Sequence, residues 1–249
     1  MCSSSLIKCM RRVLLLSDDE SYLAETGRDL HTKSGVIKAN KIKIGKVVRT
    51  HLGKEFLAVK PTIRDVLRKA ERGAQVILPK DVAMILGYTG ISADSVIVDA
   101  GSGSGYAAIF LANYVPNGKV VTYENDKRFV KIVQKNVKAS ESSNIKVKRA
   151  DVTRGIKERN VDLVLLDLQN ADKVVKHAYN SLKGGGYLVV YSPTVDHLMK
   201  SLKAVRKRFI GIETVENIVR EWQTERTVRP KTMGLMHTGF LTFARKGLK

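Results

Sequence analysis

A strand that leads into three closely spaced glycines limits the possible folds of this chain more than any other segment. Val96-Ile97-Val98 is a short run of β-branched residues, as is typical of a strand buried on both faces. Gly101, Gly103 and Gly105 follow it at alternate positions, and the residues near 105–114 have the pattern of a helix. Glycine is required where the backbone turns tightly and a ligand comes close to it. The segment therefore predicts a strand, a ligand-binding turn and a helix.

Downstream of Ala93 the sequence alternates between strand and helix patterns. Helices are expected near 126–140, with Asp126 in the first turn, and near 194–209. Besides 96–98, the expected strands are 120–123, 145–148, 163–166, 187–191, 212–215 and 240–243. Repeated alternation of this kind predicts an α/β fold with a mainly parallel, doubly wound sheet.

The first 70 residues have a different pattern. Short apolar alternations at 41–48 and 55–59 predict strands, and glycines separate them. We therefore expect a small basic β domain at residues 1–70 and a larger domain at 71–249. Three lysines alternate along the first of these strands, either as phosphate contacts or as a solvated face: Lys41, Lys43 and Lys46.

The whole chain is strongly basic. Its 249 residues include 44 Lys and Arg against 24 Asp and Glu, a formal net charge of +20. Residues 1–80 contribute 17 against 8, so the small domain is the more densely basic part. Such a charge indicates a polyanionic partner, with nucleic acid ahead of an anionic membrane. Hydrophobic residues make up 43 % of the chain, which excludes a disordered basic tail.

No segment predicts a membrane span or a disulfide framework. No apolar run approaches the ~18–20 residues that a span needs. Val13-Leu14-Leu15-Leu16 follows two arginines, but acidic residues come soon after it, so we do not expect a signal peptide. The two cysteines, Cys2 and Cys9, cannot build a disulfide framework or a zinc site. We therefore expect a cytoplasmic protein without a bound metal.

The spacing of the glycines distinguishes between classes of ligand. In the dinucleotide-binding fingerprint two residues separate the second and third glycines, whereas here only Ser104 does. The Gly-Lys-Ser/Thr of a phosphate-binding P-loop does not follow. An acid followed by Gly-x-Gly-x-Gly instead resembles motif I of the class I S-adenosylmethionine-dependent methyltransferases. The resemblance implies a Rossmann-like, seven-stranded methyltransferase sheet and these cofactor-binding residues: Asp99, Gly101, Ser102, Gly103, Ser104 and Gly105.

Acidic residues also stand at the ends of the strands that follow. Glu124 ends the second strand, about 20 residues beyond the glycines, where a carboxylate can accept both ribose hydroxyls. Asp151 follows the third strand and is expected to meet the adenine amino group. Asp167 ends the fourth strand and is expected to face the methyl group. A single acid at a strand end is often only a helix N-cap, but three in register with the glycine turn favour S-adenosylmethionine as the cofactor.

Three further stretches are similar to the tRNA (adenine-N1)-methyltransferase family, and the small N-terminal β domain matches it too. They are Gln75-Val76-Ile77-Leu78-Pro79-Lys80-Asp81, then Leu166-Asp167-Leu168, then Arg229-Pro230 with the later His237-Thr238-Gly239-Phe240. The chain departs from the family pattern at Leu78, where an aromatic residue or histidine is frequent, and at Gln169, where proline is usual.

The resemblance implies an activity. Members of this family transfer the methyl group of S-adenosylmethionine to N1 of an adenosine in the T-loop of tRNA, at position 58 and, in archaeal members, at position 57 as well. It implies Asp167 as the catalytic carboxylate, with the alternative that Asp167 only orders the turn or positions the cofactor. It also implies tRNA as the partner and a homotetramer. The implied substrate-binding residues are Gln75, Arg229, His237 and Thr238.

Two other interpretations of the sequence stay open. The first is a class I methyltransferase for another substrate, such as a damaged protein carboxylate or a corrinoid precursor. It does not account for the basic small domain or for the Arg-Pro and His-Thr-Gly segments. The second is a non-catalytic RNA-binding subunit of a methyltransferase. The intact glycine turn, Glu124 and Asp167 argue against it.

Overall fold

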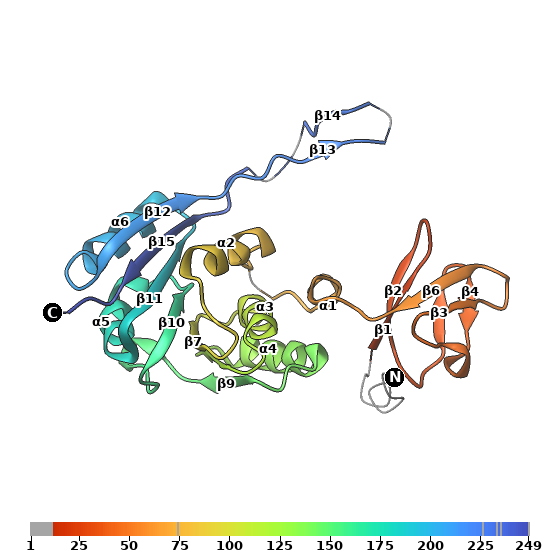
Figure 1. The fold of residues 1–249 in the computed structure, drawn as a ribbon, viewed down its shortest axis with the longest axis horizontal. Helices are drawn as coiled ribbons and strands as arrows, with labels where there is room; N and C mark the ends of the chain where they lie inside the picture. Colours follow the sequence, from red (N-terminus) through yellow and green to blue (C-terminus); the bar gives the residue numbers. More distant parts are fainter. Residues whose placement is uncertain (1–11, 74, 226, 233, 235, 249) are drawn as a thin grey trace. The chain divides into compact units, whose positions relative to one another are not determined.

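The computed structural model describes residues 12–73, 75–225, 227–232, 234 and 236–248 (Figure 1). Cys2 and Cys9 lie outside these residues. The chain divides into two units, which we call the N-terminal unit and the C-terminal unit. The N-terminal unit holds the described residues up to Ala70 together with 139–141, and the C-terminal unit holds the others.

The N-terminal unit is built on a four-stranded antiparallel sheet. Apolar side chains of these strands and of the β-hairpin at residues 30–37 supply a small core, in which Val13, Leu15, Ile37 and Phe56 are almost completely buried. The sheet, in the order β2-β1-β6-β5, consists of β1 (Arg12–Leu16), β2 (Ser21–Glu25), β5 (Val47–Arg49) and β6 (Glu55–Val59). A hairpin, a 3-10 turn and a helix complete the unit: β3 (Leu30–Thr32), β4 (Gly35–Ile37), η2 (Ala39–Lys41) and α1 (Ile63–Lys69).

The strand predicted at 41–48 is wrong for most of its length. Lys41 ends the 3-10 turn, Gly45 adopts a φ of +80°, and only β5 pairs with β6. Ile42 and Ile44 are partly buried against the core, so they produce an alternating pattern without a strand partner. The three alternating lysines therefore do not lie along one strand: Lys41, Lys43 and Lys46.

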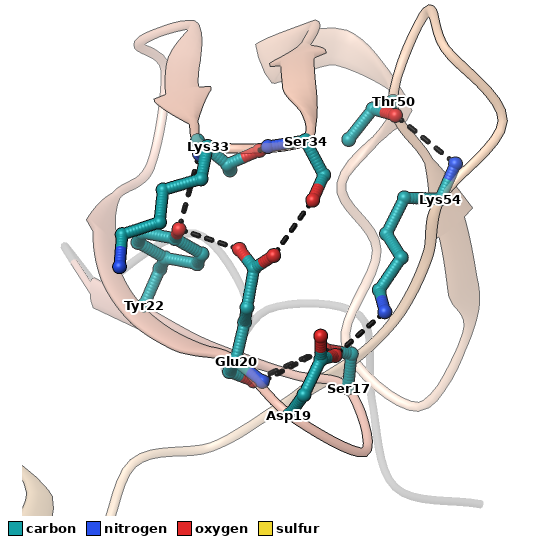
Figure 2. A network of polar contacts seen from close by, with 9 residues as sticks. Ser17, Asp19, Glu20, Tyr22, Lys33, Ser34, Thr50 and Lys54 are labelled. Carbon is teal, nitrogen blue, oxygen red and sulfur yellow. Dashed lines mark hydrogen bonds and ion pairs between the residues drawn. The ribbon is translucent and has the colours of Figure 1, made fainter.

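Polar side chains connect three turns of the N-terminal unit (Figure 2). Glu20 accepts hydrogen bonds from Tyr22 Oη (2.5 Å) and Ser34 Oγ (2.6 Å). Lys54 Nζ lies 2.6 Å from Asp19 Oδ1. These hydrogen bonds lower the pKa values of both carboxyl groups, mainly through Lys54 for Asp19 and through Ser34 for Glu20. The network thus holds the β1–β2, β3–β4 and β5–β6 turns to one another.

The C-terminal unit has the predicted α/β fold. Its seven-stranded sheet has the order β12-β15-β11-β10-β7-β8-β9. The strands are parallel except for β15, which is antiparallel to both of its neighbours. This topology confirms the doubly wound, seven-stranded sheet expected from the sequence. The strands are β7 (Val96–Ala100), β8 (Lys119–Glu124), β9 (Ile145–Arg149), β10 (Val161–Leu166), β11 (Leu182–Ser192), β12 (Ile210–Glu216) and β15 (Phe240–Arg245).

Helices connect these strands, and a hairpin interrupts the last connection. The helix predicted at 194–209 is shorter, because a turn follows Val205 and leads into β12. The helices are α2 (Pro79–Thr89), α3 (Tyr106–Tyr114), α4 (Lys127–Ser140), α5 (Ala171–Ser181) and α6 (Val195–Val205), with the 3-10 turn η3 (Val152–Arg154). Figure 1 shows the hairpin, β13 (Trp222–Gln223) with β14 (Arg229–Pro230), extending past the ends of β12 and β15.

The chain reverses its path across the sheet next to β7. From β7 it continues outward through β8 and β9, and it then returns to β10 on the other side of β7. Ligands of such sheets bind outside the carboxyl ends of the strands at this reversal. Ile97 and Val98 are completely buried, as expected for a strand covered on both faces. No helix in the described part of the chain is long and apolar enough to cross a membrane.

Candidate active site

The glycine turn brings β10 into direct contact with the end of β7. Gly101 has a φ of +94°, and a Cβ at this position would lie 1.9 Å from the main-chain oxygen of Asp167. Gly105 has a φ of +80°, and its Cβ would lie 2.6 Å from Val133 Cγ2 in α4. Both backbone conformations are ones that residues with a side chain rarely adopt. Glycine is therefore required here both by conformation and by space.

A cavity of about 450 Å³ lies at the carboxyl ends of the strands around this turn. This volume falls within the usual range for sites that take a small molecule. Six of the residues predicted from the sequence line it: Gln75, Gly101, Gly103, Glu124, Asp151 and Asp167. The lining also includes the apolar residue Leu168 of the Leu-Asp-Leu stretch, and two apolar residues that the sequence did not point to: Phe129 and Val152.

The carboxylate of Glu124 is held in place by main-chain donors. Its Oε2 accepts a hydrogen bond from the N–H of Gly103 (3.0 Å). Its Oε1 accepts from the N–H groups of Asn125 (2.9 Å) and Asp126 (3.0 Å). A carboxylate has about four acceptor positions, and these three donors leave about one of them, on Oε2, for a hydroxyl group of a ligand. The geometry agrees with the predicted role of Glu124 toward a ribose.

Asp99 is buried at the end of β7, before the glycine turn, and does not line the cavity. It is 1 % exposed, and its Oδ2 accepts a hydrogen bond from Thr122 Oγ1 (2.6 Å). Its Oδ1 has no partner among the residues that the structure describes. Burial raises the pKa of Asp99 to about 7, against the effect of the Thr122 hydrogen bond. The hydroxyls of Ser102 and Ser104 are likewise engaged elsewhere, with Thr122 and with the N–H of Gly73.

Asp167 presents a carboxyl group to the cavity. Its N–H donates to the carbonyl of Ala100 (2.8 Å), which fixes the main chain beside the glycine turn. Within the described ranges its carboxyl group makes no hydrogen bond, so it remains available to a ligand. Burial, and then the charge of Asp99, raise the pKa of Asp167 to about 7.

Asp151 has a different environment from that of Asp167. It caps η3, and its Oδ1 accepts hydrogen bonds from the N–H (2.9 Å) and Oγ1 (2.7 Å) of Thr153. These hydrogen bonds lower the pKa of Asp151. Asp151 therefore lines the cavity as an ionised carboxylate at neutral pH, whereas the pKa of Asp167 is raised.

The C-terminal residues predicted to bind substrate do not line this cavity. Arg229 is exposed in β14. The imidazole of His237 contacts Glu216 Oε1 (2.5 Å) and the carbonyl of Pro193 (3.0 Å), and these hydrogen bonds raise its pKa. Thr238 is 4 % exposed, and its hydroxyl donates to Asp81 Oδ2 (2.9 Å). The structure thus places Thr238 in the interior, where its hydroxyl does not face the cavity.

The cavity has the groups that S-adenosylmethionine requires. This molecule carries an ammonium and a sulfonium cation, a ribose with two hydroxyls, and an adenine. Four acidic residues line the cavity, and the carboxyl group of one of them, Asp167, has no protein partner within the described residues. The absence of a Cβ at Gly101 leaves the strand ends close together, and Phe129 and Leu168 supply apolar surface for a purine. The residues present therefore fit this cofactor.

Comparisons with known proteins agree with this site. Residues 67–232 match the family model described as the tRNA methyltransferase complex GCD14 subunit. TrmI of Methanocaldococcus jannaschii, a tRNA (adenine(57)-N(1)/adenine(58)-N(1))-methyltransferase, is 32 % identical over 94 % of this chain and 91 % of its own length.

Two solved structures are similar over nearly the whole chain. The tRNA (m1A58) methyltransferase TrmI from Aquifex aeolicus has a TM-score of 0.76 and 25 % identity, and the match covers 96 % of this chain and 97 % of that one. An S-adenosylmethionine-dependent O-methyltransferase from Thermotoga maritima has a TM-score of 0.83 and 29 % identity, and that match covers 96 % and 93 %. The chain belongs to the GCD14/TrmI family of S-adenosylmethionine-dependent tRNA (adenine-N1)-methyltransferases.

Proposed function

We propose that this enzyme methylates N1 of adenosine 58 in the T-loop of tRNA, with adenosine 57 as a second target, and that Asp167 is its catalytic carboxylate. The observation that carries the proposal is the carboxyl group of Asp167, which lies at the end of β10 in the cavity without a protein partner among the described residues. The name of the Methanocaldococcus jannaschii relative, which gives both positions, supports the choice of nucleotides.

Methyl transfer to N1 is favoured by a hydrogen-bond acceptor at the position of Asp167. S-adenosylmethionine supplies an electrophilic methyl group when it is bound. N1 of the target adenine in the tRNA attacks this methyl group with its lone pair. A nitrogen–carbon bond forms as the carbon–sulfur bond breaks, and the positive charge passes from the sulfonium to the target base. No proton has to leave N1. Asp167 accepts a hydrogen bond from the exocyclic amine, which stabilises the positive charge that develops on the ring.

In this proposal the remaining predicted residues bind either the cofactor or the tRNA. Glu124 accepts a ribose hydroxyl and Asp151 the adenine amine of the cofactor. In this proposal Gln75, an exposed residue of the cavity lining, contacts the target base. N1 lies on the Watson–Crick edge, so the adenosine leaves its stack before it enters the site. Arg229 and His237 contact the tRNA outside the cavity.

The product of the reaction tests this proposal. The protein is incubated with S-adenosylmethionine and an unmodified tRNA transcript, and the digested nucleosides are identified by mass and retention. We expect 1-methyladenosine, lost in part when adenosine 58 is replaced by guanosine and completely when 57 is replaced too. Labelled methyl on protein but not on tRNA would indicate another class I substrate. A failure to bind the cofactor in calorimetry would indicate a non-catalytic subunit.

Salt should weaken the binding of tRNA much more than the binding of S-adenosylmethionine. The chain carries a net +20, and the sequence up to residue 80 is its more densely basic part. Each phosphate that Lys or Arg neutralises adds about −0.7 to −0.9 to the slope of log affinity against log salt. We expect the KM for tRNA to rise at least about tenfold between 50 and 200 mM salt. The Kd of S-adenosylmethionine, a small cation, should change less than about twofold. Equal changes in both constants would contradict an electrostatic role in tRNA binding.

We also propose a homotetramer in the cytoplasm. Support for association comes from the β13–β14 hairpin and its surroundings, where large apolar side chains are exposed to solvent. Exposed apolar side chains that gather in one segment can form a surface that contacts another protein. The exposed residues are Ile218, Val219, Trp222, Val228 and Met236.

A further inference from the structure

Two segments that lie 157 residues apart share a buried polar network. Lys80 Nζ donates to Asp81 Oδ1 (2.7 Å), to Thr238 Oγ1 (2.8 Å) and to the carbonyl of Asn217 (2.5 Å). Thr238 Oγ1 in turn donates to Asp81 Oδ2 (2.9 Å), with a sequence separation of 157. Asp81 is 1 % exposed. All three donors of the ammonium and both oxygens of the carboxylate are therefore occupied.

Stability alone does not explain this network. Taking an ammonium and a carboxylate out of water costs several kcal/mol, and a well-packed apolar group often stabilises a fold as well. Lys80 and Asp81 open α2, whereas Thr238 lies just before β15. The network therefore fixes one loop against the start of a helix with defined geometry, which apolar contacts would not do as specifically.

The fixed loop contacts Tyr191, which lies at the end of the strand next to the proposed catalytic carboxylate. Tyr191 Oη donates to the carbonyl of Thr238 (2.5 Å), and a Cβ at Gly239 would lie 2.6 Å from Tyr191 Cζ. Tyr191 follows Val190, which pairs with Leu166, the residue before Asp167. Burial, and then the charges of Asp81 and Asp167, raise the pKa of Tyr191 to about 12, so its hydroxyl stays a donor at neutral pH. The loop is thus held from both sides, by the network and by Tyr191.

We propose that Lys80, Asp81 and Thr238 form a positioning clamp for the methyl-transfer site. The clamp holds residues 237–239 against Tyr191, on the strand next to Asp167, so that this side of the site keeps its shape when the target base enters. None of the three residues lines the cavity of about 450 Å³, so they act through the loop rather than on the cofactor. This inference rests on the proposed function, because the deficit it predicts concerns orientation of the RNA base.

A pair of substitutions at one position tests the clamp. T238V keeps the shape of the side chain and removes the hydroxyl, whereas T238S keeps the hydroxyl. We expect T238V to lower kcat for tRNA about 10- to 100-fold, the loss that a small misplacement causes. The Kd of S-adenosylmethionine should stay within about twofold, because the cavity is intact. T238S should restore kcat to within about threefold of the parent enzyme.

Thr242 provides a matched control in the same part of the chain. It is completely buried in β15, and its hydroxyl pairs with Thr214 Oγ1 (3.0 Å), outside the clamp. T242V should lower the Tm about as much as T238V does and leave kcat unchanged. Equal kcat values for T238V and T242V, or a parallel loss of cofactor affinity in T238V, would overturn the inference. T238A replaces T238V if that variant does not fold. A parent enzyme that forms no 1-methyladenosine would instead overturn the proposed function.

Discussion

Replacing Asp167 by Asn should lower kcat for tRNA methylation about 100- to 1000-fold, the usual cost of losing one preorganised group that stabilises developing charge. The Asn side chain has the same shape, but it offers a neutral amide in place of an anionic acceptor. The Kd of S-adenosylmethionine should stay within about fivefold, because Glu124 and Asp151 remain. Single-turnover rates and calorimetry on the same preparations measure the two effects.

The pH dependence of the parent enzyme provides a second readout for Asp167. Burial and the charge of Asp99 raise its pKa from 3.8 to about 7, so the carboxyl group is largely protonated below neutrality. Only the ionised form carries the negative charge that stabilises the cationic base, so kcat should rise with pH through about 7 and then level off. The D167N variant should lack this rise. Full activity of D167N would refute the catalytic role, and a joint loss of activity and cofactor binding would leave only cofactor positioning.

The same shift determines a dependence of stability on pH. The pKa of Asp167 is raised in the folded protein, from 3.8 to about 7, so the unfolded chain releases this proton first as the pH rises. The contribution of Asp167 to the free energy of unfolding is therefore largest at low pH and decreases as the pH rises from about 4 to about 7. Asp99, with a pKa of about 7 for the same reason of burial, acts in the same direction.

The sequence was sufficient for the parts of the site that follow from local rules. Strand, glycine turn and helix follow one another within a few residues at 96–114, and the structure has them as β7, the turn and α3. Carboxyl ends of parallel strands meet at one edge of the sheet, so acids at 124, 151 and 167 were expected together, and all three line the cavity.

Features that depend on tertiary contacts could not be predicted from patterns in the sequence. The clamp joins Asp81 to Thr238, and no short-range signal marks such a pair. Ser102 and Ser104 share the glycine motif, but their hydroxyls bond to Thr122 of β8 and to the N–H of Gly73, because a motif does not give the direction of a side chain. Ile42 alternates with Ile44 as in a strand, yet both pack on the core from a loop.

Replacing Gly101 by Ala should remove cofactor binding and destabilise the C-terminal unit. The added Cβ would lie 1.9 Å from the main-chain oxygen of Asp167, and a φ of +94° is strained for alanine. Backbone atoms cannot rotate away as a flexible side chain can, so the end of β10 has to move. We expect a loss of about 2–5 kcal/mol in the free energy of unfolding, from backbone strain and overpacking together. The Kd of S-adenosylmethionine should rise more than about 100-fold, since β10 carries Asp167 with it.

A substitution at Gly90 is the control for G101A, because it introduces backbone strain without a steric clash. Gly90 ends α2 with a φ of +56°, and a Cβ there would meet no atom within 4 Å. G90A should therefore cost only about 1 kcal/mol, the strain of a left-handed residue, and should leave the Kd of the cofactor unchanged. Denaturant unfolding and calorimetry on both variants give the comparison. If G101A and G90A were equally stable and bound the cofactor equally well, contact between the glycine turn and β10 would not shape the site. A selective loss in G101A would show that the site depends on the missing Cβ at the junction of β7 and β10.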